Sequence, residues 1–256
     1  MKLENKVAIV TGAASGMGRA IAARYGQEGA RVCVADIDHQ AAQLIAEGIG
    51  NGAFACHLDV TEQGSIDSMV AKVVDIAGGI DILVNSAGIF DAGSIETVTR
   101  EQWARLFSVN IEGTLFTLQA VARQMIAQAR GGKIINLSSQ GGRRGDARVL
   151  AYGASKATVI SVTQSAALHL IKHRINVNAI APGVVDTPMW DVVDREFGKL
   201  TGREPGKSKE LAGSAVPFGR MGKPEDFGGI AVFLASDDSE YVVAQTYGVD
   251  GGNWMA

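Results

Sequence analysis

The sequence predicts an α/β fold of the Rossmann-like, doubly wound type: a parallel seven-stranded sheet with helices on both faces, in a single domain. Three observations favour this fold. Short apolar runs recur along the chain, each followed by a longer segment with helical spacing. Most of the runs do not alternate polar with apolar residues, which is typical of strands buried on both faces of a parallel sheet. A glycine-rich turn follows the first run, and alternating strands and helices produce this architecture.

Seven apolar runs are expected to be strands, at residues 7–10, 32–35, 53–58, 82–84, 133–137, 175–180 and 246–249. Six intervening or following segments are expected to be helices, at 16–29, 39–49, 62–77, 99–129, 151–172 and 224–235. Aromatic residues make up only 6% of the chain, so the core is expected to consist mainly of alanine, valine, isoleucine and leucine.

The prolines divide the chain. All five lie after residue 181, so the first two thirds is an uninterrupted βα framework. Residues 184–222 form a long segment outside the βα pattern, and an insertion of this length is usually a functional lid or a disordered segment. Its position before the last βα unit and its scattered Trp and Phe favour a lid with short helices. We find no repeat, linker or second core, and expect one domain over residues 1–256.

Composition and charge narrow the class of protein. The net charge of −3 and pI near 5.8 give no electrostatic basis for binding nucleic acid or an anionic membrane. The N-terminus lacks the features of a signal peptide, and no apolar run is long enough to span a bilayer. We therefore expect a cytoplasmic protein, in which Cys33 and Cys56 are buried thiols rather than a disulfide. His169 and His173 have the spacing of a zinc pair but no third ligand, so no metal site is expected.

The turn T-G-A-A-S-G-M-G at 11–18 lies between the first strand and the first helix. Gly12 allows a tight turn, Gly16 allows close approach of a ligand to the backbone, and Gly18 lets the helix pack near the strand. This arrangement points the helix N-terminus at a phosphate group. Because glycine turns also occur for structural reasons, the strand-turn-helix context is what makes this a dinucleotide site.

Asp36 ends the second strand, 18 residues after Gly18. A carboxylate there can accept both ribose hydroxyls of NAD and would repel the 2′-phosphate of NADP. Neither Ser15 nor Ile37 supplies a cation for such a phosphate, so the expected cofactor is NAD. Asp36 could also be a helix N-cap, although Asp38 is available for that role. Further contacts are expected where the third and fourth strands end, from Asp59 and Val60 to the adenine and from Asn85, Ala87 and Gly88 to the ribose.

Tyr152 and Lys156 lie one helical turn apart in Y-G-A-S-K. A phenol titrates near 10, so lowering its pKa to neutrality needs roughly 4 kcal/mol. A nearby ammonium favours the phenolate, and Lys156 together with the positive ring of an oxidised nicotinamide could supply this energy. The Y-x3-K pattern alone is common by chance. Its position behind a nucleotide-binding turn is what indicates catalysis.

Together these motifs resemble the short-chain dehydrogenase/reductase family over the whole chain. They are T-G-x3-G-x-G, Asn85-x-Ala87-Gly88, Asn110, Ser139, Tyr152-x3-Lys156 and Pro182-Gly183. The resemblance implies that Tyr152 is the acid/base, that Lys156 lowers its pKa and holds the nicotinamide ribose, and that Ser139 binds the reacting oxygen. Asn110 would hold a water that relays the proton. It also implies cofactor contacts from Ser15, Met17, Pro182, Gly183, Val185 and Thr187, the last to the carboxamide.

Within this family, residues 131–146, 215–222 and 249–255 are most similar to bacterial polyol dehydrogenases that act on sorbitol or galactitol. The chain departs from them at Ser86, at Asp146 in place of the usual Glu, and in Thr-Pro-Met after Asp186. The resemblance implies oxidation of a secondary hydroxyl of a sugar alcohol to the ketose, in a homotetramer. Expected substrate contacts are Ser139, Tyr152, Gln140, Asp146 and Trp190. The alternatives are another short-chain substrate, such as a 3-oxoacyl thioester, and a non-catalytic NAD-sensing protein.

Overall fold

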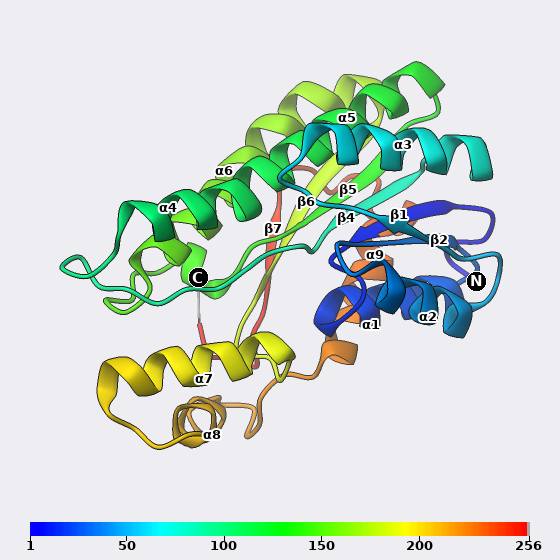
Figure 1. Cartoon of the computed structure of the whole chain (residues 1–256). Coiled ribbons are helices and arrows are strands. Elements are labelled where there is room, and N and C mark those ends of the chain that lie inside the picture. Colours follow the sequence, from blue (N-terminus) through cyan, green and yellow to red (C-terminus); the bar gives the residue numbers. More distant parts are fainter. Residues whose placement is uncertain (255–256) are drawn as a thin grey trace.

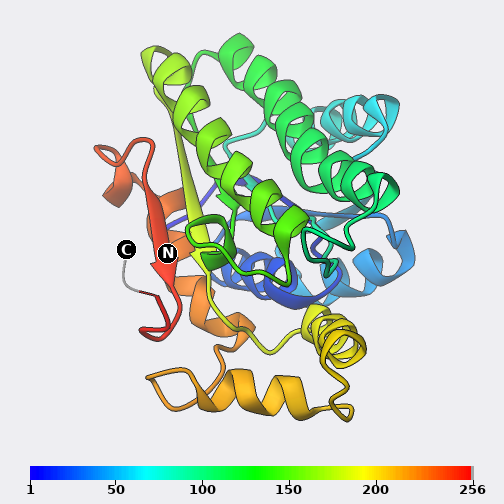
Figure 2. The same cartoon turned by 90° about the vertical axis from the view of Figure 1, so that its left-hand side faces the viewer.

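A seven-stranded parallel sheet forms the centre of the molecule, with its strands in the order β3-β2-β1-β4-β5-β6-β7 (Figure 1). The computed structural model describes residues 1–254. The strands are β1 (Val7–Thr11), β2 (Arg31–Asp36), β3 (Phe54–His57), β4 (Ile82–Asn85), β5 (Gly132–Leu137), β6 (Ile175–Pro182) and β7 (Thr246–Val249). The predicted sheet is thus confirmed. Figure 2 shows β7 at one edge, beside β6.

The direction of sheet growth reverses between β1 and β4. The chain first builds outward from β1 to β2 and β3, then returns so that Ala8 pairs with Ile82 and Val10 with Val84. Loops that leave such a switch point diverge, and ligands of open α/β sheets bind in the crevice that results. The expected dinucleotide site therefore lies at the carboxyl ends of β1 and β4.

Helices cover both faces of the sheet (Figure 1). One face carries α1 (Gly16–Gln27), α2 (His39–Ile49) and α9 (Gly228–Ala235), and the other carries α3 (Gln63–Ala77), α5 (Gly113–Gln128) and α6 (Leu150–Leu170). Two clusters of buried side chains, mostly Ala, Val, Ile and Leu, fill the space on the two sides. The strands are buried on both faces because helices pack on each, which explains why their sequences do not alternate.

The single helix expected over residues 99–129 has an interruption. It consists of α4 (Arg100–Phe107), a π-helical turn η1 (Ser108–Glu112) and α5. The widened turn contains Asn110, which is fully buried. A π-turn inserts one extra residue into a helix and often occurs at functional sites. Nothing in the apolar spacing announces it, because the chain stays helical on both sides.

Residues 184–222 contain two helices, α7 (Pro188–Thr201) and α8 (Lys207–Ser214), which lie beyond the carboxyl ends of the strands (Figure 1). Asp194 of α7 joins them, since its carboxylate accepts hydrogen bonds from the backbone N–H of Gly206 (2.6 Å) and Lys209 (2.8 Å) at the start of α8. These contacts make the two helices one unit. A small apolar cluster around Phe197 joins this unit to Tyr152 and Phe90.

Smaller structural elements complete the described chain. They are the short helical turns η2 (Gln140–Gly142), η3 (Ile171–His173), η4 (Pro224–Phe227) and η5 (Asp237–Ser239). Cys33 and Cys56 are buried, unbridged thiols on the adjacent strands β2 and β3. Among residues 1–254, no helix has both the length and the apolar character needed to cross a bilayer.

Candidate active site

The glycine turn after β1 leaves no room for side chains. A Cβ on Gly12 would lie 2.8 Å from the Cα of Ala87, and a Cβ on Gly18 would lie 2.3 Å from the carbonyl oxygen of Gly12. Gly12 also has a φ of +62°, a conformation that favours glycine. The loops after β1 and β4 therefore touch, and α1 begins directly against the turn. Ser15 occupies the N-cap position of α1 without a side-chain capping bond, which leaves this helix end available to an anion.

A cavity of about 340 Å³ lies over this turn. Its wall brings together the following residues expected to bind cofactor: Gly12, Ser15, Gly16, Met17, Gly18, Asp36, Asp59, Val60, Ala87, Gly88 and Thr187. Ile89, Val109 and Met189 also line it and were not foreseen. A glycine cradle, a free helix N-terminus and a carboxylate at the far end match the phosphates and ribose of a dinucleotide. The residues present thus fit the expected cofactor.

Asp36 connects the end of β2 with the glycine turn. One carboxylate oxygen accepts from the Ala14 N–H (2.9 Å) and the other from the Asp38 N–H (3.0 Å). The N-cap of α2 is Asp38, whose side chain accepts from the Ala41 N–H. Asp36 is therefore not the helix cap, and its carboxylate lines the cavity in a fixed orientation.

Asn85 lies elsewhere than the sequence suggested. Its side chain is buried, donating to the Asn136 side-chain oxygen (2.9 Å) and to the Thr114 carbonyl (3.4 Å), and it lines neither the cofactor cavity nor the cavity beside it. A polar side chain inside the sheet must be hydrogen-bonded, and Asn136 meets this need on the adjacent strand. The Asn85 amide thus holds β4 to β5, and Ala87 and Gly88 form the cavity wall.

Tyr152 and Lys156 lie one turn apart on α6, and Tyr152 lines a second cavity. Burial raises the pKa of the Tyr152 phenol, and the neighbouring Ser139 hydroxyl acts in the opposite direction. Burial lowers the pKa of Lys156 to about 8, while its Nζ donates to the Leu137 carbonyl (2.9 Å). Lys156 Nζ lies 5.9 Å from the centre of the Tyr152 ring. The ammonium by itself therefore does not make the phenol a base in this site.

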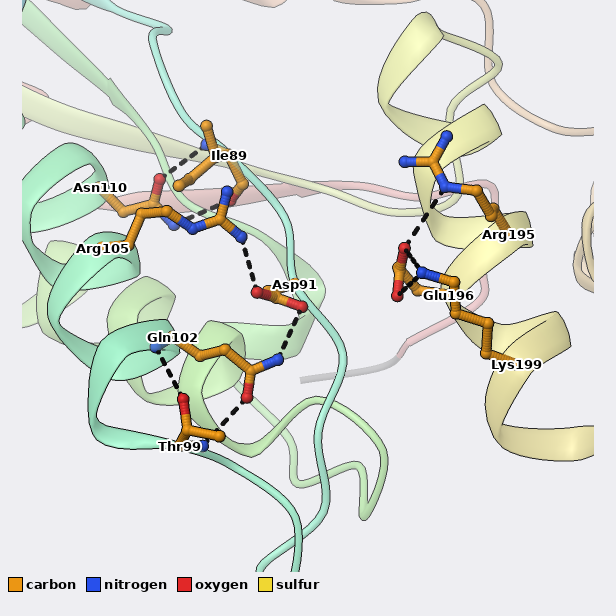
Figure 3. Close-up of polar contacts among 9 residues, drawn as sticks. All are labelled: Ile89, Asp91, Thr99, Gln102, Arg105, Asn110, Arg195, Glu196 and Lys199. Atoms are coloured by element: carbon orange, nitrogen blue, oxygen red, sulfur yellow. Dashed lines mark hydrogen bonds and ion pairs between the residues drawn. The ribbon is translucent and has the colours of Figure 1, made fainter.

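Asn110 holds the loop that follows β4 (Figure 3). Its side-chain oxygen accepts from the Ile89 N–H (2.8 Å), and its amide nitrogen donates to the Ile89 carbonyl (3.0 Å) and to the Ser155 hydroxyl (3.1 Å). Both amide hydrogens are therefore in use. A Cβ on Gly88 would lie 3.2 Å from the Asn110 side-chain oxygen and 3.4 Å from Lys156 Nζ. Asn110 and Lys156 thus lie behind Gly88, and neither lines the two cavities.

The second cavity, of about 360 Å³, brings together all five expected substrate contacts: Ser139, Gln140, Asp146, Tyr152 and Trp190. Pro182, Gly183 and Val185 also line it, so they lie on this side rather than over the glycine turn. Met17, Thr187 and Met189 line both cavities, which therefore adjoin. A nicotinamide at this junction would lie beside Tyr152 and Ser139. Ser138 also lines this cavity, but its hydroxyl is engaged, since it donates to the Lys156 carbonyl (2.8 Å).

Several cavity residues were missed by sequence reasoning. Arg148 forms a two-pronged ion pair with Asp146 (2.9 and 2.6 Å), and its guanidinium lies 4.3 Å from the centre of the Phe197 ring of α7. Burial works against the Asp146 carboxylate, but the Arg148 contacts outweigh it and lower the pKa of Asp146. Ser208 and Asn253 also line the cavity. Of these residues, only Asn253 lies in a segment that the sequence marked, because residues 249–255 resemble polyol dehydrogenases. That resemblance did not predict that Asn253 lines the cavity.

Comparison with known proteins identifies the family of this chain. The profile of a family described as enoyl-(acyl carrier protein) reductase matches residues 12–253. The chain is 57% identical to sorbitol dehydrogenase of Cereibacter sphaeroides and 55% identical to galactitol 2-dehydrogenase of Agrobacterium fabrum, each over the full length of both chains. A short-chain type dehydrogenase/reductase from Mycobacterium marinum superposes with a TM-score of 0.91 at 33% identity, covering 100% of this chain and 98% of that one. The protein therefore belongs to the short-chain dehydrogenase/reductase family.

Proposed function

We propose that this protein is an NAD-dependent polyol dehydrogenase, which oxidises a secondary hydroxyl of a sugar alcohol of the sorbitol or galactitol type to the ketose, reversibly. The observation that carries the proposal is the second cavity. There a phenol and a serine hydroxyl lie beside the cofactor cavity, and Gln140 and Asp146 add polar groups that suit a hydroxyl-rich chain. The names of the two relatives given above support the same substrate class.

In this proposal Tyr152 accepts the proton of the reacting hydroxyl, and Ser139 donates a hydrogen bond to the oxygen as it becomes a carbonyl. An oxidised nicotinamide, when bound, would supply the acceptor for the hydride leaving the carbinol carbon and a positive charge that lowers the pKa of Tyr152. This charge is needed because burial raises that pKa in the free protein. Binding of the oxidised cofactor would therefore both activate Tyr152 as the base and provide the hydride acceptor.

We assign Lys156 and Asn110 to positions behind the reacting atoms. Lys156 would hold the nicotinamide ribose and return the proton to solvent through water. Because both amide hydrogens of Asn110 are in use, a relay water would be held by its backbone carbonyl, which already accepts from the Thr114 hydroxyl (2.9 Å). A carbonyl has a second lone pair for such a water.

The preference for NAD over NADP rests on Asp36. Its carboxylate is fixed by two backbone N–H groups and faces the cofactor cavity, so a 2′-phosphate would lie against a negative charge. The other cofactor contacts of the proposal are the remaining expected residues of the cavity over the glycine turn, with Thr187 at the carboxamide.

We further propose that α7 and α8 close over bound substrate, that the protein is a homotetramer and that it acts in the cytoplasm. Trp190 and Phe197 of α7 line the substrate cavity, which supports a lid. Exposed apolar side chains on α4, α5 and α6, among them Trp103, Phe116 and Leu168, support association of subunits. Two unbridged cysteines suit a reducing compartment. Light scattering that gives a mass other than four times 26.8 kDa would contradict the tetramer.

The function is tested by following absorbance at 340 nm while purified protein and NAD are offered sorbitol, galactitol, mannitol, xylitol, ribitol and simple diols. We expect turnover of hexitols with NAD and much less with NADP. The second candidate is reduction of a 3-oxoacyl thioester, which the name of a further relative supports: a 3-oxoacyl-[acyl-carrier-protein] reductase of Thermotoga maritima, 41% identical over 98% of this chain. Activity on acyl thioesters or hydrophobic ketones alone would replace the polyol proposal, and NAD binding without any turnover would favour a sensor.

A further inference from the structure

The C-terminal segment of the described chain folds back onto the loop that follows β5. The Asn253 side-chain nitrogen donates to the Gln140 side-chain oxygen (3.0 Å), across 113 positions of sequence. Beside this contact the Arg144 guanidinium lies 5.0 Å from the centre of the Trp254 ring, and the Arg143 guanidinium donates to the Thr246 carbonyl. The segment that ends at Trp254 is therefore fixed next to the loop that carries Ser139.

Gln140 and Asn253 both line the substrate cavity, together with Ser139 and Tyr152. The contact between the two amides uses one acceptor of Gln140 and one donor of Asn253. Within residues 1–254, the Gln140 side-chain nitrogen and the Asn253 side-chain oxygen have no hydrogen-bond partner in the protein. Side by side, the two amides therefore offer a ligand one unused donor group and one unused acceptor.

The pair of amides is not needed to hold residues 250–254 in place. Gly251 accepts a hydrogen bond from the Phe218 N–H (3.0 Å), and the Gly252 N–H donates to the Asp250 carboxylate (2.9 Å). Together with the stacking of Arg144 on Trp254, these contacts fix the segment without the amide pair. Anchoring this segment therefore does not explain why the amides of Gln140 and Asn253 lie at the cavity wall.

We propose that Gln140 and Asn253 together form a subsite that recognises hydroxyl groups along the substrate chain, away from the reacting carbon. This inference rests on the proposed polyol function and deepens it. A hydroxyl group both donates and accepts, so it matches a donor and an acceptor that stand side by side. A ketone or thioester oxygen only accepts, and an alkyl chain does neither. A substrate without further hydroxyls would leave two polar groups unpaired, which a site of this kind penalises.

The test compares Gln140→Leu, Asn253→Leu and the double variant with the wild type. Leucine resembles both amides in size and removes their hydrogen bonding. For each protein, kcat/KM with NAD is measured for sorbitol, which has five further hydroxyls, and for 2,3-butanediol, which has one. We expect each single variant to lower the ratio of the two values about tenfold, the effect of one or two lost hydrogen bonds. The double variant should lose less than the product of the single losses, because the amides act as a pair.

Gln245→Leu is the matched control, because Gln245 is an amide in the same terminal region that does not line the cavity and bonds to the Val243 carbonyl (3.0 Å). Its ratio should equal that of the wild type. The dissociation constant for NAD and the melting temperature show whether each variant is folded. If Asn253→Leu does not bind NAD, Asn253→Ala replaces it.

The outcomes separate this inference from the proposed function. A wild type that oxidises no polyol ends both, and this result needs no variant. A wild type that oxidises hexitols, with single variants whose ratio stays within twofold, ends this inference and leaves the polyol function standing. If kcat/KM falls equally for sorbitol and for 2,3-butanediol, this inference also fails, because the amides would then act on the reacting centre or on the fold.

Discussion

Replacing Lys156 by methionine should make the protein more stable while it abolishes turnover. Lys156 is almost completely buried, and burial lowers its pKa from 10.5 to about 8. Holding it protonated at neutral pH therefore costs the folded state about 3 kcal/mol relative to the unfolded chain. Methionine fills similar space without charge, but it leaves the Leu137 carbonyl without its partner, at a cost of about 1 kcal/mol. We expect a net gain of about 2 kcal/mol at pH 7.

The dependence on pH identifies the cause. The unfolded chain binds this proton up to about pH 10.5 and the folded protein only up to about pH 8, so wild-type stability rises relative to the variant between these values. The advantage of Lys156→Met should thus be largest at pH 7 and shrink as the pH rises above 8. Using the difference between the two proteins cancels every other titrating group, including Lys133, whose pKa burial also lowers.

The assay is thermal unfolding of both proteins at equal concentration, at several pH values between 7 and 9.5, without cofactor. A gain of about 2 kcal/mol corresponds to a rise in melting temperature of roughly 4–8 °C for a chain of this size. Lys156→Arg is the control that keeps the charge, and it should show no gain. A methionine variant less stable than the wild type at pH 7, or a difference that does not change with pH, would refute the reasoning.

Three further predictions concern the cofactor and the base. Tyr152→Phe should keep NAD affinity and lower turnover at least about 10²-fold; rates within threefold of the wild type would remove Tyr152 from its role. Asp36→Asn should weaken NAD binding about tenfold or more and raise the affinity for NADP relative to NAD. The control Asp38→Asn, at the N-cap of α2, should change stability alone. Calorimetric titration of each variant with both cofactors measures these affinities. Gly18→Ala should abolish NAD binding, because the new Cβ would lie 2.3 Å from a carbonyl oxygen. The control Gly64→Ala has open space around its Cβ, so this variant should bind NAD normally and gain up to about 1 kcal/mol of stability.

Much of the fold could be predicted because its signals are local. Each strand is a short apolar run bounded by polar or glycine residues, and all seven form within a few residues of the predicted bounds. The glycine turn could also be predicted from its spacing, although the space around Gly12 is limited by Ala87 in the loop after the neighbouring strand β4. The π-turn at Asn110 could not be predicted, because it depends on hydrogen bonds to Ile89 and Ser155 rather than on helical spacing.

Most parts of the site that were missed depend on contacts between distant segments; the exception is Arg148, which pairs with Asp146 two positions before it. Asn85 looked like a cofactor residue because its neighbours Ala87 and Gly88 are, yet its amide belongs to a buried network that exists only once β4 lies beside β5. Asn253 reaches the substrate cavity only because β7 is placed at the sheet edge beside β6. Catalytic residues recur in sequence motifs since the chemistry constrains their spacing.

The residues that we propose to contact the substrate obey no such constraint. Gln140, Asp146 and Trp190 were expected from resemblance. Asn253 became visible only through Gln140, 113 positions away, whereas Arg148 pairs with Asp146 two positions away and was not expected as a cavity residue. Each of the two holds an expected contact in place: Arg148 orients the Asp146 carboxylate, and Asn253 orients the Gln140 amide. Changes at these partners should therefore alter which alcohol is preferred while the proton transfer at Tyr152 is kept. In this proposal the chain shares the family's catalytic motif, while its substrate preference depends on paired side chains such as Gln140 and Asn253, which lie 113 positions apart.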